Sequence, residues 1–272
     1  DLSQEHDVVV GDYDDRSLAN VKKLNQNITT QKLDVTNQSK LKEFISESDI
    51  VLLAVPGHLG YSALRTIVES KKNVVDISFS NENFLDLHNL AKDAGVTAVV
   101  DAGLAPGIPN YLLGFHNSQM EIDTFEYYVG GLPKYPKPPF NYKAPFSPID
   151  VIEEYTRPAR MMVNGQIVTK PALSGIETMD FEKIGTLEAF NTDGLRSILF
   201  TMKHIKNMKE KTLRYSGHAA LMANYRNAGK FNDDQILKTS KELFEAWKLE
   251  TNEPEVTVMK IIIKGESKSI SY

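Results

Sequence analysis

The sequence predicts an α/β protein that begins with a Rossmann-type, doubly wound parallel sheet. Short apolar runs of strand length alternate with helix-spaced segments through the first hundred residues. Four of the five runs end on or next to an acidic residue or a Pro-Gly pair. The alternation stops after residue 122, so a second domain of α+β architecture is expected there.

Five strands and four helices are expected between residues 8 and 101. The strands are predicted at 8–11, 28–33, 50–55, 73–77 and 96–101, and the helices at 16–24, 41–45, 59–70 and 82–94. Strands that alternate with helices are joined by right-handed crossovers and therefore lie parallel. In such sheets, ligands bind outside the carboxyl ends of the strands.

The segment 96–110 is the most informative part of the sequence. A β-branched run ends at Asp101, and a helical pattern starts near Tyr111. Between them stand Gly103, Pro106, Gly107 and Pro109. Glycines allow close backbone approach and prolines stiffen a loop, as expected beside a ligand crevice. An ordinary strand-to-helix turn is the alternative.

Asp12 follows the first apolar run. In a nucleotide-binding sheet an acid after the second strand binds the adenosine ribose, and capping of the next helix is the alternative. The ribose role makes 8–11 the second strand, but no Gly-x-Gly-x-x-Gly precedes it. A first strand and phosphate loop, about 20 residues, are therefore expected before Asp1. A protein that truly began at Asp1 is expected to bind cofactor poorly.

The two domains are expected at 1–121 and 122–272, the first incomplete at its N-terminus and the second at its C-terminus. The second is predicted to contain strands at 125–129, 178–181 and 255–264, a hairpin at 161–168 with an Asn164-Gly165 turn, and helices at 194–205, 217–228 and 233–247. The proline-rich segment 133–148 is expected to form a packed loop or lid, in which Tyr135 and Tyr142 shape the lid or simply pack. A proline-rich recognition ligand is the alternative.

Composition narrows the possible functions. The sequence is 41% hydrophobic and 25% charged, with a net charge of −5, which argues against a nucleic-acid partner. No apolar run approaches the roughly 20 residues of a membrane span, and no signal-peptide pattern is present. The absence of cysteine excludes disulfides and fits a cytoplasmic location. The 6 histidines include no His-x-x-x-His pair, so no metal is expected.

Five further motifs stand in order along the sequence. They are Asp-Ala-Gly-Leu-Ala-Pro-Gly at 101–107, Tyr-Val-Gly-Gly-Leu-Pro at 128–133, Glu-Glu-Tyr-Thr-Arg-Pro-Ala-Arg at 153–160, Gly-Thr-Leu-Glu-Ala-Phe-Asn-Thr-Asp-Gly-Leu at 185–195 and Lys-Thr-Leu-Arg-Tyr-Ser-Gly-His at 211–218. Together they resemble the saccharopine dehydrogenase/reductase-like family, and within it most closely the NAD-dependent lysine 6-dehydrogenases.

The resemblance implies a Rossmann domain with NAD, and a substrate domain that also forms a homo-oligomer, a dimer or larger. It implies an oxidoreductase that moves hydride from C6 of L-lysine to the nicotinamide, after which water releases the semialdehyde and ammonia. Two alternatives stay open: a saccharopine-type enzyme acting on a secondary amine, and a non-catalytic dinucleotide-binding regulatory protein. A secondary-amine substrate carries more carboxylates than lysine does. It would therefore need more arginines than the three that stand near these motifs.

The resemblance also implies a set of cofactor-binding residues. Asp12 would hold the adenosine ribose, and an acid there repels the 2′-phosphate of NADP, which favours NAD. The remaining residues are Asp34 and Val35 near the adenine, Ala54, Val55 and Pro56 along the ribose–pyrophosphate path, and Asp76, Ala105, Pro106 and Gly107 on the nicotinamide side.

The chemistry needs a clamp for the substrate's α-carboxylate. The forked guanidiniums of Arg157, Arg160 and Arg214 suit this role, with Arg214 and its neighbour Tyr215 preferred. A structural ion pair is the alternative for each arginine.

Oxidation of a lysine side chain also needs a neutral ε-amine and therefore a base or a desolvating pocket. The candidate acid–base residues are His218, Asp193 and Glu154, in that order. The alternatives are a packing or capping role for His218, a cap of the 194–205 helix for Asp193, and a solvated or buried structural acid for Glu154.

Overall fold

The computed structural model describes residues 2–144, 147–250, 252–266 and 268–272. The protein forms two compact units, Asp1–Val100 and Asp101–Tyr272. The boundary between the units lies before the expected position at residue 121, because helix α5 (Ile108–Asn117) packs into the second unit, where its Leu113 is fully buried in the core.

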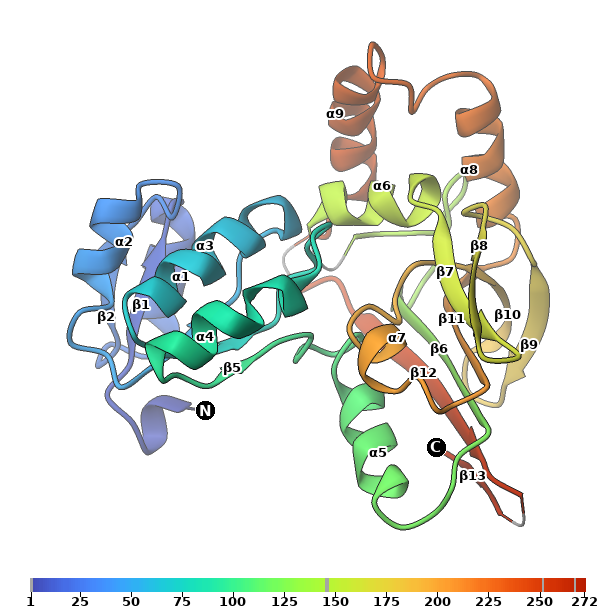
Figure 1. Ribbon diagram of the computed structural model, residues 1–272. Coiled ribbons are helices and arrows are strands. Elements are labelled where there is room, and N and C mark those ends of the chain that lie inside the picture. Colours follow the sequence, from blue (N-terminus) through green and yellow to red (C-terminus); the bar gives the residue numbers. More distant parts are fainter. Residues whose placement is uncertain (1, 145–146, 251, 267) are drawn as a thin grey trace. The chain divides into compact units, whose positions relative to one another are not determined.

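Two separate parallel sheets form the first unit (Figure 1). Strands β1 (Val9–Asp12) and β2 (Thr29–Lys32) make one pair, and β3 (Ile50–Leu53), β4 (Asn73–Asp76) and β5 (Ala98–Val99) make the other sheet. Within the described residues no strand joins the two sheets. All five strands overlap the predicted segments, and all run parallel as predicted.

A short η1 (Leu2–Gln4) precedes β1, and helices follow the next strands as expected. They are α1 (Asp15–Leu24), α2 (Gln38–Phe44), α3 (Gly57–Glu69), η2 (Phe84–Leu87) and α4 (His88–Ala94). The Asp14 carboxylate accepts from the amides of Arg16 and Ser17, so Asp14 rather than Asp12 caps α1. Ile67 and Val68 of α3 are fully buried against the core of the sheet.

A mixed sheet organises the second unit, in the order β13-β12-β6-β11-β10-β9, with the β7–β8 hairpin joined through β11. The strands are β6 (Thr124–Pro133), β7 (Ala159–Val163), β8 (Gln166–Lys170), β9 (Glu177–Phe181), β10 (Gly185–Asn191), β11 (Asn207–Tyr215), β12 (Glu255–Lys264) and β13 (Ser269–Ser271). β6 and β11 are parallel and the other neighbours antiparallel. The predicted hairpin is confirmed, with positive φ at Asn164 (49°) and Gly165 (78°) as a type I′ turn requires.

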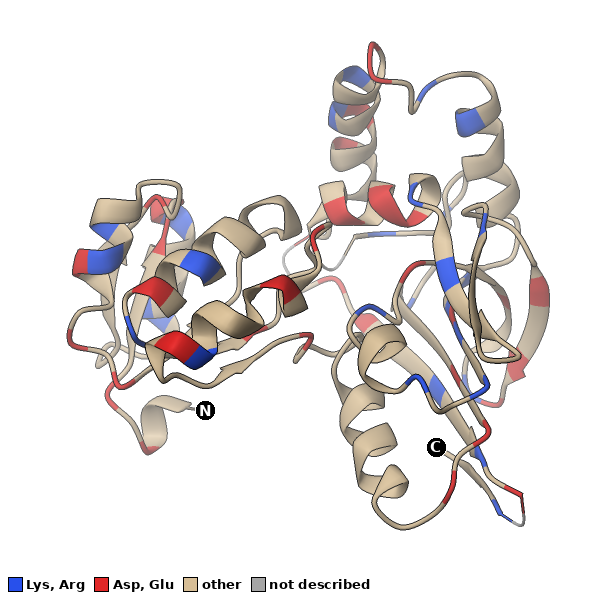
Figure 2. Ribbon diagram, in the orientation of Figure 1, with Lys and Arg blue, Asp and Glu red and all other residues tan. Residues whose placement is uncertain are grey.

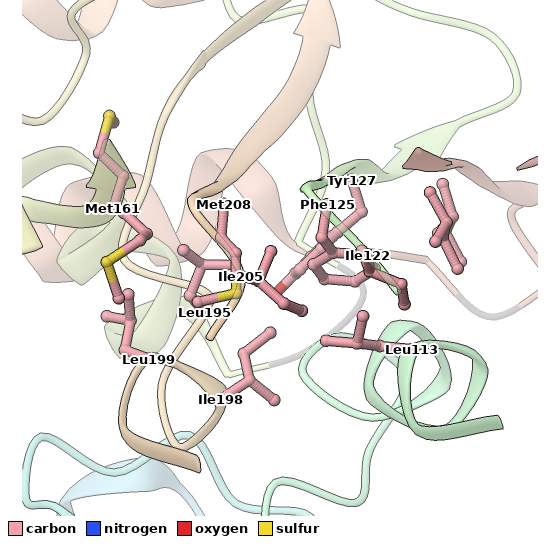
Figure 3. Packing of buried hydrophobic residues seen from close by; sticks show 13 residues of the cluster. Leu113, Ile122, Phe125, Tyr127, Met161, Leu195, Ile198, Leu199, Ile205 and Met208 are labelled. Carbon is pink, nitrogen blue, oxygen red and sulfur yellow. The ribbon is translucent and has the colours of Figure 1, made fainter. Parts of the chain in front are cut away.

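Two helical groups pack on the second unit's sheet. Figure 3 shows one core, which contains Leu113 of α5, Ile198 and Leu199 of α7 (Ile198–Thr201), and Phe125 and Tyr127 of β6. The other core surrounds Trp247 and holds α6 (Pro148–Thr156), α8 (His218–Asn227) and α9 (Ile236–Trp247).

The predicted helix at 194–205 is wrong for most of its length, because α7 spans only Ile198–Thr201. Arg196 has φ of 50°, and the amide of Gly194 donates to the Glu210 carboxyl group instead of joining a helix. Helix α6 was not predicted. Its buried Val151, Ile152 and Tyr155 carry the helical spacing that could have shown it.

Candidate functional site

The residues expected to bind cofactor in the first unit lie at the carboxyl ends of its parallel strands. Asp12 ends β1, Asp34 and Val35 follow β2, the segment 54–56 follows β3, and Asp76 ends β4. Asp12 and Asp34 retain solvent contact, which suits carboxylates that accept hydrogen bonds from ribose hydroxyls. Asp12 and Asp34 could therefore accept hydrogen bonds from a bound nucleotide, whereas Asp76, predicted on the nicotinamide side, has no exposed surface.

Local hydrogen bonds orient these acids. Asp12 Oδ1 accepts from the amide of Asp14 at 2.7 Å. Asp34 Oδ1 accepts from the hydroxyl and amide of Thr36, and these bonds lower the pKa of Asp34. Asp76 is fully buried, and its Oδ1 accepts from the Ser78 hydroxyl at 2.8 Å.

A lysine lies beside Asp12 in the sheet. Lys32 is its register partner across β1 and β2, and the Lys32 Nζ lies 2.5 Å from Asp15 Oδ2. The ion pair raises the pKa of Lys32. This cation is thus engaged by a neighbouring carboxylate in the structure.

The loop that contains Ala105, Pro106 and Gly107 belongs to the second unit. Gly107 has φ of 152°, and a Cβ placed on it would lie 1.6 Å from the Gly103 carbonyl oxygen, so no side chain fits there. The loop is tied to the second unit by Asp101, whose Oδ2 accepts from the amide of Ser197 at 2.9 Å. The close approach of Gly107 to the backbone of Gly103 explains why residue 107 is a glycine.

Arg214 and Glu154 form a buried ion pair. Arg214 Nη2 lies 2.5 Å from Glu154 Oε2, and the guanidinium stands 4.4 Å from the ring centroid of Tyr142. The Arg214 side chain is only 2% exposed. Burial raises the pKa of Glu154, and the Arg214 charge opposes that rise. A substrate carboxylate could reach Arg214 only by displacing Glu154.

His218 belongs to the same cluster. Its Nδ1 lies 2.7 Å from the Phe140 carbonyl oxygen and its Nε2 lies 2.8 Å from the Tyr155 hydroxyl. Because a carbonyl oxygen only accepts, Nδ1 carries the proton and Nε2 accepts from Tyr155. Burial and the Arg214 charge lower the pKa of His218 to about 3. His218 is therefore neutral, with both ring nitrogens engaged, which matches the packing role considered from the sequence.

Asp193 is the centre of a second cluster. It accepts from the Arg160 amide, Nε and Nη2 at 3.1, 2.9 and 2.8 Å, and from Arg196 Nη1 at 2.9 Å. Arg157 interacts electrostatically with the charged residues of this cluster and forms an ion pair with Glu153 on α6. Figure 2 shows the acidic positions along α6 and the basic position on β7. Asp193 therefore binds arginines and does not cap α7.

The structure separates Tyr215 from its neighbour Arg214. The two follow each other on β11 and so project to opposite faces of the sheet. The Tyr215 hydroxyl donates to the Pro133 carbonyl at 3.0 Å. Among the arginines proposed for the substrate carboxylate, Arg160 is the most accessible, with 31% of its side chain exposed.

The sequence analysis did not identify Glu210 as a candidate site residue. It lies on β11 and contacts Thr192 and Gly194, on either side of Asp193. The sequence carried no clear signal for it, because residues 209–212 of this strand are all polar and burial of Glu210 is seen only in the structure.

The described residues offer neither a metal-binding cluster nor a membrane-spanning helix. Across them, no three or more His, Asp or Glu side chains gather in a way that could hold a metal ion. No helix in the described part of the protein is long and apolar enough to cross a membrane.

The fold and the strand-end acids define a protein with a Rossmann-like dinucleotide-binding domain and a second, sheet-based domain. Residues 1–99 match the model of the saccharopine dehydrogenase NADP binding domain, and residues 103–271 match that of the saccharopine dehydrogenase C-terminal domain. The chain belongs to the saccharopine dehydrogenase family.

Curated relatives and a solved structure agree with this assignment. The chain is 28% identical over 229 residues to alpha-aminoadipic semialdehyde synthase of Arabidopsis thaliana, covering 78% of this chain and 22% of that protein. It is 26% identical over 228 residues to saccharopine dehydrogenase [NADP(+), L-glutamate-forming] of Saccharomyces cerevisiae, covering 79% and 50%. The chain thus spans a quarter or less of the semialdehyde synthases that it matches.

The apo saccharopine dehydrogenase (L-Glu forming) of Saccharomyces cerevisiae superimposes with a TM-score of 0.70 at 18% identity. The match covers 98% of this chain and 78% of that one, and it shows a shared fold.

Proposed function

We propose that this protein is an oxidoreductase that transfers hydride between a nicotinamide dinucleotide and the side-chain carbon that bears the amine of a lysine-type amino acid. Two features of this family member support the proposal. Acidic residues suited to a dinucleotide stand at its strand ends, and arginines cluster around Asp193. The nicotinamide, when bound, supplies the hydride acceptor.

L-lysine is the first candidate substrate. Its neutral ε-amine would lose hydride from C6 to form an iminium ion, and water would then release the semialdehyde and ammonia. Arg160 is the residue best placed to hold the α-carboxylate, because its side chain is partly exposed and a guanidinium forks onto a carboxylate. His218, Asp193 and Glu154 are the candidates for proton transfer, and each is already engaged: His218 by Tyr155 and Phe140, Asp193 by Arg160 and Arg196, and Glu154 by Arg214.

Saccharopine is the second candidate. Relatives of the protein are named saccharopine dehydrogenases. In addition, Arg157, Arg160 and Arg196 all interact with Asp193, so this cluster contains an arginine that the sequence analysis did not count. A substrate with several carboxylates would use such a cluster more fully than lysine.

NAD is proposed as the cofactor. Asp12 at the end of β1 favours it, because a carboxylate there repels a 2′-phosphate. The matched family model is described as NADP binding, which supports the other dinucleotide. Homo-oligomerisation and the absence of a nucleic-acid partner stay predictions.

A substrate screen tests the proposal. The full-length protein is given lysine, saccharopine or short diamines with NAD or NADP, and the absorbance of the reduced cofactor is followed. Turnover on lysine with NAD is expected. Turnover on saccharopine alone would select the second candidate, and dinucleotide binding without turnover on any amine would indicate a regulatory protein.

A further inference from the structure

The turn Thr192–Gly194 is held by contacts at each of its residues. The Thr192 hydroxyl contacts Glu210 Oε2 at 2.6 Å, and the Gly194 amide donates to the same oxygen at 3.0 Å. The Gly194 carbonyl accepts from the Tyr127 hydroxyl at 2.6 Å. Asp193, between them, is the residue on which the arginines converge. One carboxyl oxygen of Glu210 therefore contacts both neighbours of Asp193.

Glu210 and Gly194 are also in close steric contact. A Cβ placed on Gly194 would lie 2.6 Å from the Glu210 Cδ, so only glycine allows the turn to approach the carboxyl group. Glu210 itself is 4% exposed. The position of the turn thus depends on the Glu210 side chain.

The charged groups around Glu210 make its ionisation costly. Glu154 of α6 and Asp193 of the turn are both acidic, and Tyr127 of β6 is a fully buried phenol. Burial raises the pKa of Glu210 to about 8, the Glu154 and Asp193 charges act in the same direction, and the bonds from Thr192 and Gly194 oppose the rise. Arg214 is paired with Glu154, and Arg160 and Arg196 are paired with Asp193.

The geometry points to Glu210 as a positioning residue of this site: its carboxyl group accepts from Thr192 and Gly194, holds the turn between them and so orients Asp193. Ionisation of Glu210 would add a negative charge beside Asp193 and Glu154. This inference deepens the proposed function and rests on it for its effect on catalysis. A negative charge at Glu210 weakens binding of a carboxylate substrate at the neighbouring arginines. KM should therefore rise at alkaline pH more than kcat falls.

Three measurements test the inference. Infrared difference spectra between about pH 6 and about pH 9.5 should show loss of a protonated carboxylic-acid C=O band, and Glu210→Gln should lack that change. Urea unfolding, followed by fluorescence of Trp247, should show an unfolding constant that rises up to about tenfold per pH unit as the pH rises from the unfolded towards the folded pKa of Glu210, because the folded protein keeps a proton that the unfolded state loses. KM for the amino-acid substrate should rise above about pH 8 in the unsubstituted protein but stay level in Glu210→Gln.

Glu188→Gln is the matched control, because Glu188 is another buried glutamate on β10 with no hydrogen bond to the turn among the described contacts. It should change none of the three pH dependences. Thr192→Val gives a second test that keeps Glu210, since loss of a bond that favours the charged form should move the infrared transition to higher pH.

An infrared transition that persists in Glu210→Gln would overturn the inference. So would the same alkaline rise of KM in Glu210→Gln and in the unsubstituted protein. If no amine is turned over, the proposed function fails, while the infrared and unfolding results still decide whether Glu210 carries the proton.

Discussion

The guanidinium of Arg214 and the carboxylate of Glu154 meet 2.5 Å apart in the interior of the second unit, although 60 residues separate them in the sequence. The pair joins β11 to α6. Tyr142 packs on the guanidinium, and Trp247 contacts Tyr142 edge-on with ring centroids 5.4 Å apart. An ion pair therefore lies within an aromatic core that includes the only tryptophan of the sequence.

Removing one partner of this pair should destabilise the second unit. Glu154→Gln leaves the Arg214 charge buried without a counter-ion, which costs about 3–5 kcal/mol. Urea unfolding followed by Trp247 fluorescence measures the change. The double variant Glu154→Met/Arg214→Met should recover much of the loss, because it removes both buried charges. A double variant less stable than either single one would contradict this account.

Stability should depend on His218 at acidic pH. The folded pKa of His218 is about 3, below its ordinary value of 6.5, so the unfolded state binds a proton that the folded protein does not. Stability from this group is present above pH 6.5 and is lost as the pH falls towards 3. His218→Asn should flatten the acid limb of the unfolding curve, whereas His204→Asn, at an exposed histidine of the same unit, should leave the limb steep.

Asp12 should control the choice of dinucleotide. Asp12→Ala removes the carboxylate that repels a 2′-phosphate, so the NAD to NADP preference should fall by on the order of tenfold. The ratio of dissociation constants from cofactor titrations measures it. Asp14→Asn is the charge-matched control, because asparagine also caps a helix and Asp12 stays in place. An unchanged ratio in Asp12→Ala would remove the basis for proposing NAD.

Asp15 should modulate the same preference through Lys32. Asp15→Asn frees the Lys32 ammonium from its ion pair beside Asp12, so NADP should bind more tightly than in the unsubstituted protein. The double variant Asp15→Asn/Lys32→Met should lose this gain. Equal NADP affinity in the single and double variants would show that Lys32 does not reach the 2′-phosphate.

Two glycines of the second unit should respond oppositely to alanine. Gly107→Ala places a methyl group 1.6 Å from the Gly103 carbonyl oxygen at a strained φ, so it should destabilise the unit by at least about 1–3 kcal/mol. Gly114→Ala, on α5 with no atom within 4 Å of its Cβ, should stabilise the unit by about 0.5–1 kcal/mol. Unfolding free energies of the two variants measure both effects, and a similar sign in both would contradict the packing of these two glycines.

Much of the first unit could be predicted because its pattern is local. Apolar runs such as Ile50–Leu53 and the helical spacing around α3 are repeated within a few residues, and all five strands lie within or overlap the predicted segments. Family membership was also recognisable from motifs in the sequence, and the matched domains at 1–99 and 103–271 confirm it.

The polar interior of the second unit could not be derived in this way. Whether Arg214 meets a substrate or Glu154, whether Asp193 caps a helix or binds Arg160, and whether His218 is accessible depend on residues 33 to 63 positions apart. The observed helix α7 is shorter than the predicted helix at 194–205 because of another contact between residues distant in the sequence: the Gly194 amide donates to the Glu210 carboxyl group.

Hydrophobic periodicity therefore specified the strands, the helices and the type of the first domain, because burial of one face imposes a pattern on neighbouring residues. The pairing of buried charges imposes no such pattern. It depends on which side chains the folded sheet and helices bring within hydrogen-bond distance, and a buried charge is tolerated only where that partner is found.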